Sequence, residues 1–542
     1  MRTLIPSTAA ALAAILLAAC TAERVDAPAS ASAARIRADV QVLADDRMQG
    51  RMTGTPGFDH AARYVAVRMQ RIGLEPAGDS GWLQRVPLQQ SVAIVERAVV
   101  VVRNDGRSTR LQPGRDVLPV PGFEDAVALT DLPMVFAGHG VHAPELGVDD
   151  FTGLDLRGRA VLLLGGAPAR LEPDLRAYYG ATATKLEALA ARGAVAAAFL
   201  RTPADEAALP WSRLAEVLAR PAMRLAEAPR TTVRAVLHVD AAAVDTLLAG
   251  SGRTLAQLAA QADAGTLPTF AFPTRLDLAA ASRVQPVESA NVVGRLPGSD
   301  ARRAGLVAIT AHLDHLGVAV GGNDRVFNGA VDNALGVAVM LEAARRMAAA
   351  PAPARDTLFV ALTGEEQGLL GAQAFAQAAT DGALIANVNL DMPLLLVPTR
   401  DVGVAGADRS ELGGHLRQAA DAMDVALTPD PMAAQGAFGR SDQFAFVRRG
   451  VPAMYLMGGV DPVHRDDDSA AATAAFMRER YHRPADDADR PVAWNDAARL
   501  AELGARTAAS VADAPRPPAW RAGDFFGGRF TPSRPLESPP LP

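Results

Sequence analysis

Cysteine is nearly absent from this 542-residue chain, in which Cys20 is the single example. The chain therefore has no intramolecular disulfide framework, and we expect neither a cysteine metal site nor a thiol nucleophile beyond the N-terminal segment. Aromatic residues make up 5% of the chain and the net charge is -6, so no basic patch with interleaved aromatics favours a nucleic-acid partner. A sizeable core is expected, because 49% of the residues are hydrophobic.

Long apolar runs are also missing, since no run reaches the ~18–20 residues needed to cross a bilayer. The N-terminus reads MRTLIPSTAAALAAILLAAC, in which Arg2 precedes an apolar run from Ala9 to Ala19. This run is too short for a comfortable membrane span and is typical of a secretory signal. Residues 17–20, LAAC, resemble a bacterial lipobox. This resemblance implies cleavage before Cys20 and lipidation of the Cys20 thiol. An ordinary signal peptide is the alternative.

The predicted location follows from this segment. We expect residues 1–20 to be a lipoprotein signal peptide and residues 21–34 to be a tether. The protein is then exported, as a periplasmic or envelope lipoprotein that meets the membrane only through its N-terminal lipid. Thr21, rather than Asp, after the cysteine resembles the outer-membrane pattern of a Gram-negative host.

The remaining chain changes pattern along its length. Apolar runs such as LVAITA, TLFVALT, IANVNL and VPAMYLM alternate with helical stretches from about residue 275, which predicts an α/β fold with a central, mostly parallel, twisted sheet flanked by helices. Helical spacing within 35–75 predicts two helices joined by a turn. Short apolar strands and Ala-rich helices predict a smaller, inserted, β-rich α/β domain at 125–270. The main domain then comprises 35–124 and 271–515, and the Pro-rich tail at 516–542 is expected to be unpacked.

Acidic residues and histidines follow the predicted strands. LVAITA is followed by His312, Asp314 and His315, TLFVALT by Glu365 and Glu366, and IANVNL by Asp391. Asp332 stands just before a predicted helix, and Tyr481 and His482 stand in a later loop, YHRPADD. Ligands of parallel sheets bind beyond the carboxyl ends of the strands, so we expect these side chains to lie close together. Imidazole and carboxylate ligands without a thiolate suit zinc or another divalent ion, and one bridging carboxylate would allow two ions.

Five motifs in order carry a family resemblance: AHLDHLG, NGAVDNALG, LTGEEQGLLG, NVNLDM and YHRPADD. They resemble the co-catalytic zinc aminopeptidases, whose relatives include bacterial leucine-type aminopeptidases, glutamate carboxypeptidase and the transferrin receptor. The resemblance covers about 275–515 and implies the zinc exopeptidase fold. The insert at 125–270 resembles the protease-associated domain that often accompanies this family.

The resemblance also implies a role for each residue. Two Zn²⁺ ions are expected, one bound by His312 and Asp391, the other by Glu366 and His482, with Asp332 bridging them. Glu365 would be the general base on the attacking water, Tyr481 an oxyanion contact, and Asp314 the partner that orients the imidazole of His312. The Asp332–Asn333 bond occupies a position that is often cis in the family.

Three further residues receive weaker interpretations. His315 is interpreted as a structural or hydrogen-bonding residue. Arg440 is either a surface arginine or a reader of a substrate carboxylate through its fork. Gln443 stands where the family often has a histidine, so no role is assigned to it.

The predicted function is an exported, lipid-anchored di-zinc aminopeptidase that acts on peptides with a free N-terminus. Three alternatives stay open: a carboxypeptidase or dipeptidase on the same scaffold, a glutaminyl cyclase-like enzyme, and a non-catalytic, receptor-like binding protein. The receptor-like reading predicts missing ligands, whereas all five ligand positions and the base are filled here. The side-chain preference, the oligomeric state and the role of the insert do not follow from the sequence.

Overall fold

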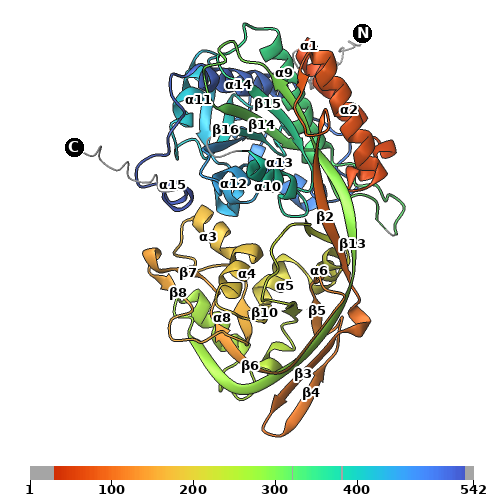
Figure 1. Ribbon diagram of the computed structural model, residues 1–542, viewed down its shortest axis with the longest axis vertical. Helices are drawn as coiled ribbons and strands as arrows, with labels where there is room; N and C mark the ends of the chain where they lie inside the picture. The colour runs from red at the N-terminus through yellow and green to blue at the C-terminus, as the bar shows by residue number, and fades with distance from the viewer. Residues whose placement is uncertain (1–29, 320, 380–382, 532–542) are drawn as a thin grey trace, which may run out of the picture.

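The computed structural model describes residues 30–319, 321–379 and 383–531, and shows two lobes joined by long strands (Figure 1). The predicted signal peptide at 1–20, with Cys20, and the tether up to residue 29 lie outside the described residues. The prediction of a tether is wrong for residues 31–34, which form the start of a helix that buries Ala33. No helix within the described part of the chain has the length and apolar character of a membrane span.

The larger lobe is built on one sheet. Its strands follow the order β11 (Ala222–Leu225), β2 (Leu83–Ala93), β13 (Thr269–Leu296), β15 (Thr357–Leu362), β14 (Leu306–His312), β16 (Leu384–Leu390), β19 (Ala453–Gly458), β17 (Asp401–Ala405) and β18 (Ala426–Pro429). The four central strands, β15, β14, β16 and β19, run parallel and are almost wholly buried. The predicted mostly parallel sheet is confirmed.

Helices cover both faces of this sheet, which is why its strands are continuous apolar runs. One face packs against α1 (Ala31–Leu43), α2 (Pro56–Ile72), α9 (Leu335–Ala348), α11 (Leu412–Asp421) and α14 (Trp494–Asp513). The other packs against α10 (Leu370–Ala378), α12 (Gln443–Val447) and α15 (Phe525–Phe530). The pair α1 and α2 is the predicted helical pair. Thr55 caps α2 by accepting from the Phe58 N–H, and Gly73 ends it in the left-handed conformation.

The smaller lobe has a second sheet with its own core. Its strand order is β4 (Arg107–Leu111), β3 (Val99–Asn104), the first half of β13, β6 (Ala126–Ala137), β9 (Ala160–Leu164), β10 (Ala196–Leu200), β12 (Ala235–Val239) and β5 (Val117–Pro119). The smaller lobe also contains β7 (His142–Ala143), β8 (Val148–Asp149), α3 (Pro173–Gly180), α4 (Thr182–Ala190), α5 (Pro203–Ala208), α6 (Trp211–Leu218), α7 (Val244–Leu247) and α8 (Leu255–Asp263).

A single long strand, β13, belongs to both sheets (Figure 1). Residues 269–281 pair with β3 and β6, and residues 282–296 pair with β2 and β15. The second sheet begins at β3, upstream of the predicted domain start at 125. Strand β5 pairs with β12 of the insert, and β3, with β4 beside it, pairs with residues 275–279 of β13. The junction between the lobes therefore lies inside a continuous strand and not in a linker.

The prediction of an unpacked tail is wrong for residues 516–531. Trp520 donates its indole N–H to the carbonyl of Gly450 at 2.8 Å. Helix α15 buries Phe526 completely, with its ring edge-on to those of Tyr178 and Phe444. Three of the six residues of α15 are phenylalanines. The apolar area that they bury stabilises the helix against the low helix propensity of its two glycines.

Candidate metal centre

The polar residues that follow the central strands gather at one edge of the larger sheet. Strand β14 ends at His312 and lies between β15, which leads to Glu365 and Glu366, and β16, which leads to Asp391. Neighbouring parallel strands end at the same edge, so residues about 50 to 80 positions apart in sequence become neighbours in space.

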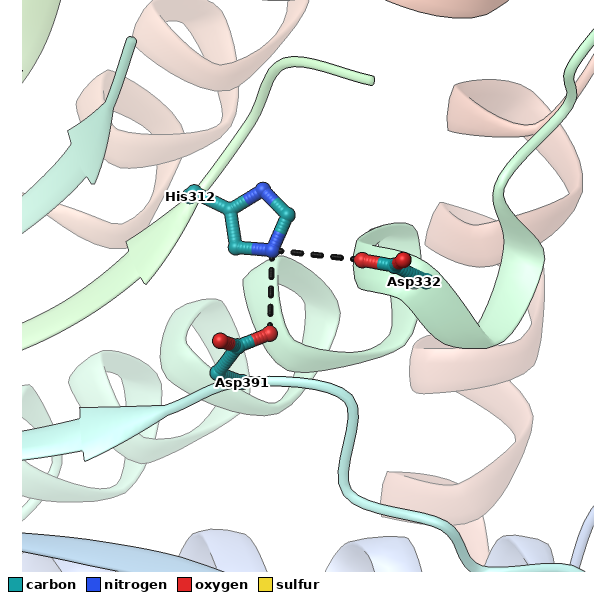
Figure 2. Close-up of side chains that lie close together, drawn as sticks. All are labelled: His312, Asp332 and Asp391. Atoms are coloured by element: carbon teal, nitrogen blue, oxygen red, sulfur yellow. Dashed lines mark hydrogen bonds and ion pairs between the residues drawn. The ribbon is translucent and has the colours of Figure 1, made fainter. Parts of the chain in front are cut away.

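The first cluster consists of His312, Asp332 and Asp391 (Figure 2). His312 Nε2 lies 2.9 Å from Asp391 Oδ1 and 3.3 Å from Asp332 Oδ1. Burial disfavours the imidazolium, but the carboxylates of Asp391 and Glu365 outweigh it and raise the pKa of His312 well above its ordinary value. Asp332 occupies the turn Ala330–Ala334 before α9, and the Asp332–Asn333 bond is cis, as expected.

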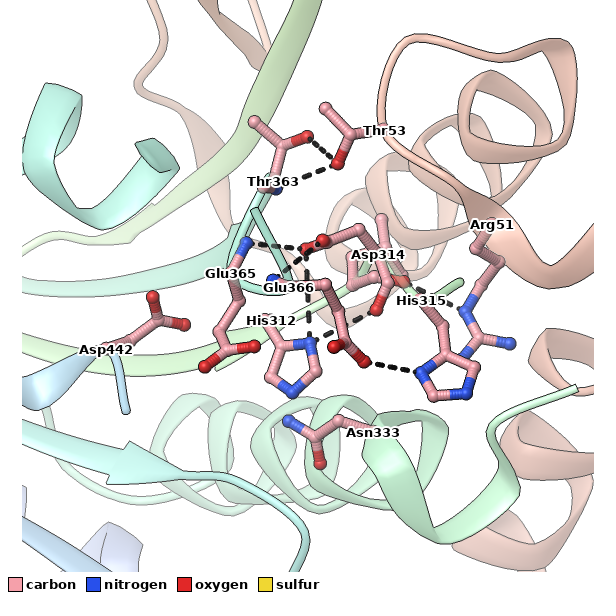
Figure 3. A network of polar contacts seen from close by, with 12 residues as sticks. Arg51, Thr53, His312, Asp314, His315, Asn333, Thr363, Glu365, Glu366 and Asp442 are labelled. Carbon is pink, nitrogen blue, oxygen red and sulfur yellow. Dashed lines mark hydrogen bonds and ion pairs between the residues drawn. The ribbon is translucent and has the colours of Figure 1, made fainter. Parts of the chain in front are cut away.

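The second cluster brings two imidazoles to Glu366. His482 Nε2 lies 3.1 Å from Glu366 Oε2 and 3.3 Å from Asp332 Oδ2. His315 Nδ1 lies 2.7 Å from Glu366 Oε1 (Figure 3). It also lies 3.9 Å from Asp332 Oδ2. The sequence prediction placed only His482 here. Burial would lower the pKa of His482, but Glu366 and Asp332 raise it to about 10.

Asp332 stands between the two clusters. Its Oδ1 faces His312 and its Oδ2 faces His482. Within the described residues, two groups hold donor atoms within 4.8 Å of one another: His312, Asp332 and Asp391, and His315, Asp332 and Glu366. Burial would raise the pKa of Asp332, but hydrogen bonds with His312 and His482 hold it well below its ordinary value. One shared carboxylate among nitrogen and oxygen donors fits a pair of zinc ions.

The side chains of Glu365 and Glu366 point in different directions, although the same residue, Asp314, holds the backbone of both. The Asp314 carboxylate accepts the backbone N–H of Glu365 at 3.1 Å and that of Glu366 at 3.3 Å (Figure 3). Glu366 then faces His315, whereas Glu365 lines the pocket. Burial, with Asp391 and Glu366 nearby, raises the pKa of Glu365 well above its ordinary value despite His312.

The predicted contact between Asp314 and His312 takes a different form. His312 Nδ1 lies 3.1 Å from the main-chain carbonyl oxygen of Asp314, and the nearer carboxylate oxygen is 3.9 Å away. The carboxylate is instead occupied by the two N–H groups of the glutamate turn. Asp314 therefore orients the imidazole through its backbone and the two glutamates through its side chain.

The clusters open into one pocket. Its lining combines His312, Asp332, Glu365, Asp391, Tyr481 and His482 with Met392, Met432, Met477 and Arg440. The ring of Tyr481 stacks on that of His482 with centroids 3.8 Å apart. Burial and the facing carboxylates raise the pKa of Tyr481, which keeps the phenol protonated and able to donate a hydrogen bond.

Two supporting residues were not predicted from the sequence. Arg51 is wholly buried and donates to the carbonyls of Leu313 at 2.8 Å and Gly329 at 3.0 Å, so it ties two loops of the site together. Asp486 accepts the N–H groups of Val331 and Asp332, each at 3.0 Å. Arg51 and Asp486 bind main-chain atoms, so their own sequence positions give little sign of this role. The position of Asp486 within YHRPADD was the only sequence feature that could have indicated it.

Two other buried residues lie behind the pocket. Gln443 accepts from Asn389 at 2.9 Å and donates to the Phe438 carbonyl at 2.7 Å, so it joins β16 to the pocket wall. The carboxylate of Asp442 is fully buried and hydrogen-bonds to none of the described residues. Burial raises its pKa well above the ordinary value although His312 opposes this.

Residues 291–508 match the family model described as Peptidase family M28. This segment lies within the larger lobe, makes up less than half of the chain and is similar to M28 peptidases; it is here called the M28 segment. The resemblance to co-catalytic zinc exopeptidases is thereby confirmed, whereas the protease-associated identity of the insert stays a prediction.

Curated relatives match over a short stretch. A "Probable zinc metalloprotease" of Pyrenophora tritici-repentis is 53% identical over 66 residues, and one of Pyrenophora teres f. teres has the same identity over the same length. These stretches are 12% of this chain and 15% and 14% of the two relatives, so the chain spans about a seventh of the curated relatives it matches. Together with the M28 segment, they support a zinc metallopeptidase.

A solved structure matches over most of the chain. The aminopeptidase from Aneurinibacillus sp. strain AM-1 superposes with a TM-score of 0.51 at 18% identity, covering 88% of this chain and 92% of that one. At this identity the match shows a shared fold. It agrees with the predicted α/β exopeptidase architecture.

Proposed function

We propose that the protein is an exported di-zinc aminopeptidase that removes N-terminal residues from peptides. One observation carries the proposal: the two carboxylate oxygens of Asp332 face two separate imidazole and carboxylate clusters. The M28 segment and the named aminopeptidase that shares the fold support the reaction class.

The donor set assigns the ligands. His312 and Asp391 would hold one zinc ion, Glu366 and His482 the other, and Asp332 would bridge them. His482 is preferred over His315 because it lines the open pocket and lies closer to Asp332 Oδ2, at 3.3 Å against 3.9 Å, whereas His315 is fully buried. Zinc held by these groups would supply Lewis-acid polarisation of the scissile carbonyl and would acidify the attacking water.

The chain's own residues carry the proton and the charge. Glu365 takes the proton of the attacking water and returns it to the leaving amine. Its carboxylate lines the pocket and belongs to neither donor group, so it is available to accept that proton. The protonated phenol of Tyr481 donates to the oxyanion that develops on the substrate carbonyl. The surrounding carboxylates favour a substrate with a free, cationic N-terminus.

The location is part of the same proposal. Lipidation of Cys20 would anchor the enzyme at the envelope, facing the periplasm, with the outer membrane as its site in a Gram-negative host. The LAAC stretch supports this. Expression of Cys20→Ala tests it, because the variant should leave the membrane fraction while retaining peptidase activity. Retention in that fraction would contradict lipid anchoring.

The activity is tested by comparing matched substrates with and without a free amine. We expect the zinc-loaded protein to cleave leucine p-nitroanilide at least ~100-fold faster than its N-acetyl form. The acetylated substrate has no cationic amine, so it would leave the surrounding carboxylates of the pocket unpaired. Efficient removal of C-terminal residues from N-acetylated peptides would favour a carboxypeptidase. Cyclisation of N-terminal glutamine would favour a glutaminyl cyclase, and absence of any turnover a binding protein.

A further inference from the structure

Arg440 places a positive charge, unpaired among the described residues, in the wall of the pocket that contains the candidate zinc ligands. It lines this pocket together with Glu365 and Tyr481, and its side chain is exposed. Within the described ranges, its guanidinium has no hydrogen bond, ion pair or ring contact. By contrast, Arg480 pairs with Asp486, and Arg409 pairs with both Asp174 and Asp524.

The backbone that carries Arg440 is held in place. The pocket wall consists of two short turns, η5 (Ala433–Gln435) and η6 (Ala437–Gly439), packed against α3 of the smaller lobe. Phe438 is fully buried, and a Cβ on Gly436 would lie 2.2 Å from Ala177 Cβ, so no larger residue fits there. The N–H of Arg440 donates to the Ala437 carbonyl at 3.2 Å. The guanidinium therefore extends from a fixed base.

The pocket that Arg440 lines is partly apolar. Met432, Met477 and Ala437 belong to its lining and offer no side-chain hydrogen bonds, although Gln435 and Ser441 line it too. In such surroundings a carboxylate paired with the guanidinium fork is bound more strongly than in open solvent. Arg440 lines the same pocket as Tyr481 and Glu365, so its guanidinium shares this cavity with the groups proposed for catalysis.

We propose that Arg440 binds a carboxylate of the substrate, so that the enzyme prefers peptides with an acidic group close to the scissile bond. The proposal rests on the proposed peptidase function and adds its substrate class. The carboxylate has three possible sources: the side chain of the N-terminal residue, the side chain of the second residue, or the C-terminus of a dipeptide. All three present the same planar acceptor to the guanidinium fork.

Three matched substrate pairs distinguish these sources. They are Glu-Ala-amide against Gln-Ala-amide, Leu-Glu-amide against Leu-Gln-amide, and Leu-Ala against Leu-Ala-amide. We expect the zinc-loaded enzyme to favour the carboxylate member of one pair by about 10–100-fold in kcat/KM. Arg440→Gln should abolish this preference, and Arg440→Lys should retain part of it. Arg448→Gln should leave it unchanged, because Arg448 is paired with Glu187 outside the pocket.

Equal rates within every pair, or a preference that survives in Arg440→Gln, would overturn the carboxylate subsite. The same pairs are also titrated into zinc-loaded Glu365→Gln by calorimetry, which tests the subsite by binding alone. If the wild-type enzyme cleaves none of the peptides but binding still depends on Arg440, the peptidase proposal fails and the subsite stands. If the peptides are cleaved but neither turnover nor binding depends on Arg440, the subsite fails and the peptidase proposal stands.

Discussion

The two lobes use the same architecture with different residues at the strand ends. Each has four adjacent parallel strands with helices packed against them, yet within the described residues only the larger lobe gathers metal donors. In the smaller lobe, buried cations face main-chain oxygens. Lys185 donates to the carbonyls of His139 and Gly166, the latter at 2.6 Å. Arg201 donates to the carbonyl of Asp205 at 2.8 Å.

This difference shows what a parallel sheet edge contributes to a site. The edge brings residues together, but chemistry depends on which groups remain unsatisfied there. In the smaller lobe each buried cation has its own carbonyl partners. In the larger lobe, carboxylates and imidazoles face one another, and divalent cations would offset the mutual repulsion of the carboxylates.

Replacing the proposed base should have the largest effect. Glu365→Gln keeps the shape of the side chain but removes the proton acceptor, so kcat should fall by about 10²–10⁴-fold. Zinc content, measured by elemental analysis, should stay at the wild-type value because Glu365 belongs to neither donor group. A variant with undiminished kcat would remove Glu365 from the mechanism.

Arg409 tests how the lobes are held together. It pairs with Asp174 on α3 and with Asp524 before α15, and its guanidinium lies over the ring of Phe438. Arg409→Met leaves two largely buried carboxylates without their cationic partner, so the free energy of unfolding should fall by about 2–4 kcal/mol in urea titrations. The control Arg448→Met removes an exposed pair with Glu187 and should cost at most ~1 kcal/mol. Equal losses would show that burial does not govern this contact.

Much of the larger lobe could be predicted from the sequence. Its central strands are buried on both faces and therefore appear as continuous apolar runs, and the polar residues after them mark the site. The start of the smaller sheet could not be predicted, because β3 and β5 join it by pairing with strands that lie far along the chain. Arg51 and Asp486 were missed for a related reason: they bind main-chain atoms, which every sequence offers equally.

Asp486 tests whether the support of the bridging residue matters. Asp486→Asn removes one charge and weakens the two hydrogen bonds that fix the backbone at Val331 and Asp332. We expect kcat/KM and zinc affinity to fall by about 10–100-fold, as for other partners that orient metal ligands. The nearby exposed Asp489→Asn should change neither quantity. Normal zinc affinity in Asp486→Asn would show that the turn holds its shape alone.

Lys185 tests the electrostatics of the smaller lobe. Burial lowers its pKa from 10.5 to about 7, with Asp150 opposing the shift. Between these values the unfolded chain binds more protons than the folded one, so the Lys185 contribution to stability should rise with pH by up to ~1.4 kcal/mol per unit. Lys185→Met should remove this slope in urea titrations from pH 7 to 10.

The same shift can be observed directly by NMR. Lys185 is the only lysine in the chain, so selective lysine labelling gives a single side-chain signal to follow through the titration. A midpoint near 10.5, together with an unchanged stability slope in the variant, would contradict a buried lysine of lowered pKa.

The central claim is that Asp332 joins two zinc sites, and metal stoichiometry tests it most directly. The protein is stripped with a chelator, reloaded with zinc, freed of excess ion and analysed for bound metal. We predict about two zinc ions per chain in the wild type and a clear loss in Asp332→Ala. Reproducible absence of zinc after loading, or a zinc content that Asp332→Ala leaves unchanged, would contradict it.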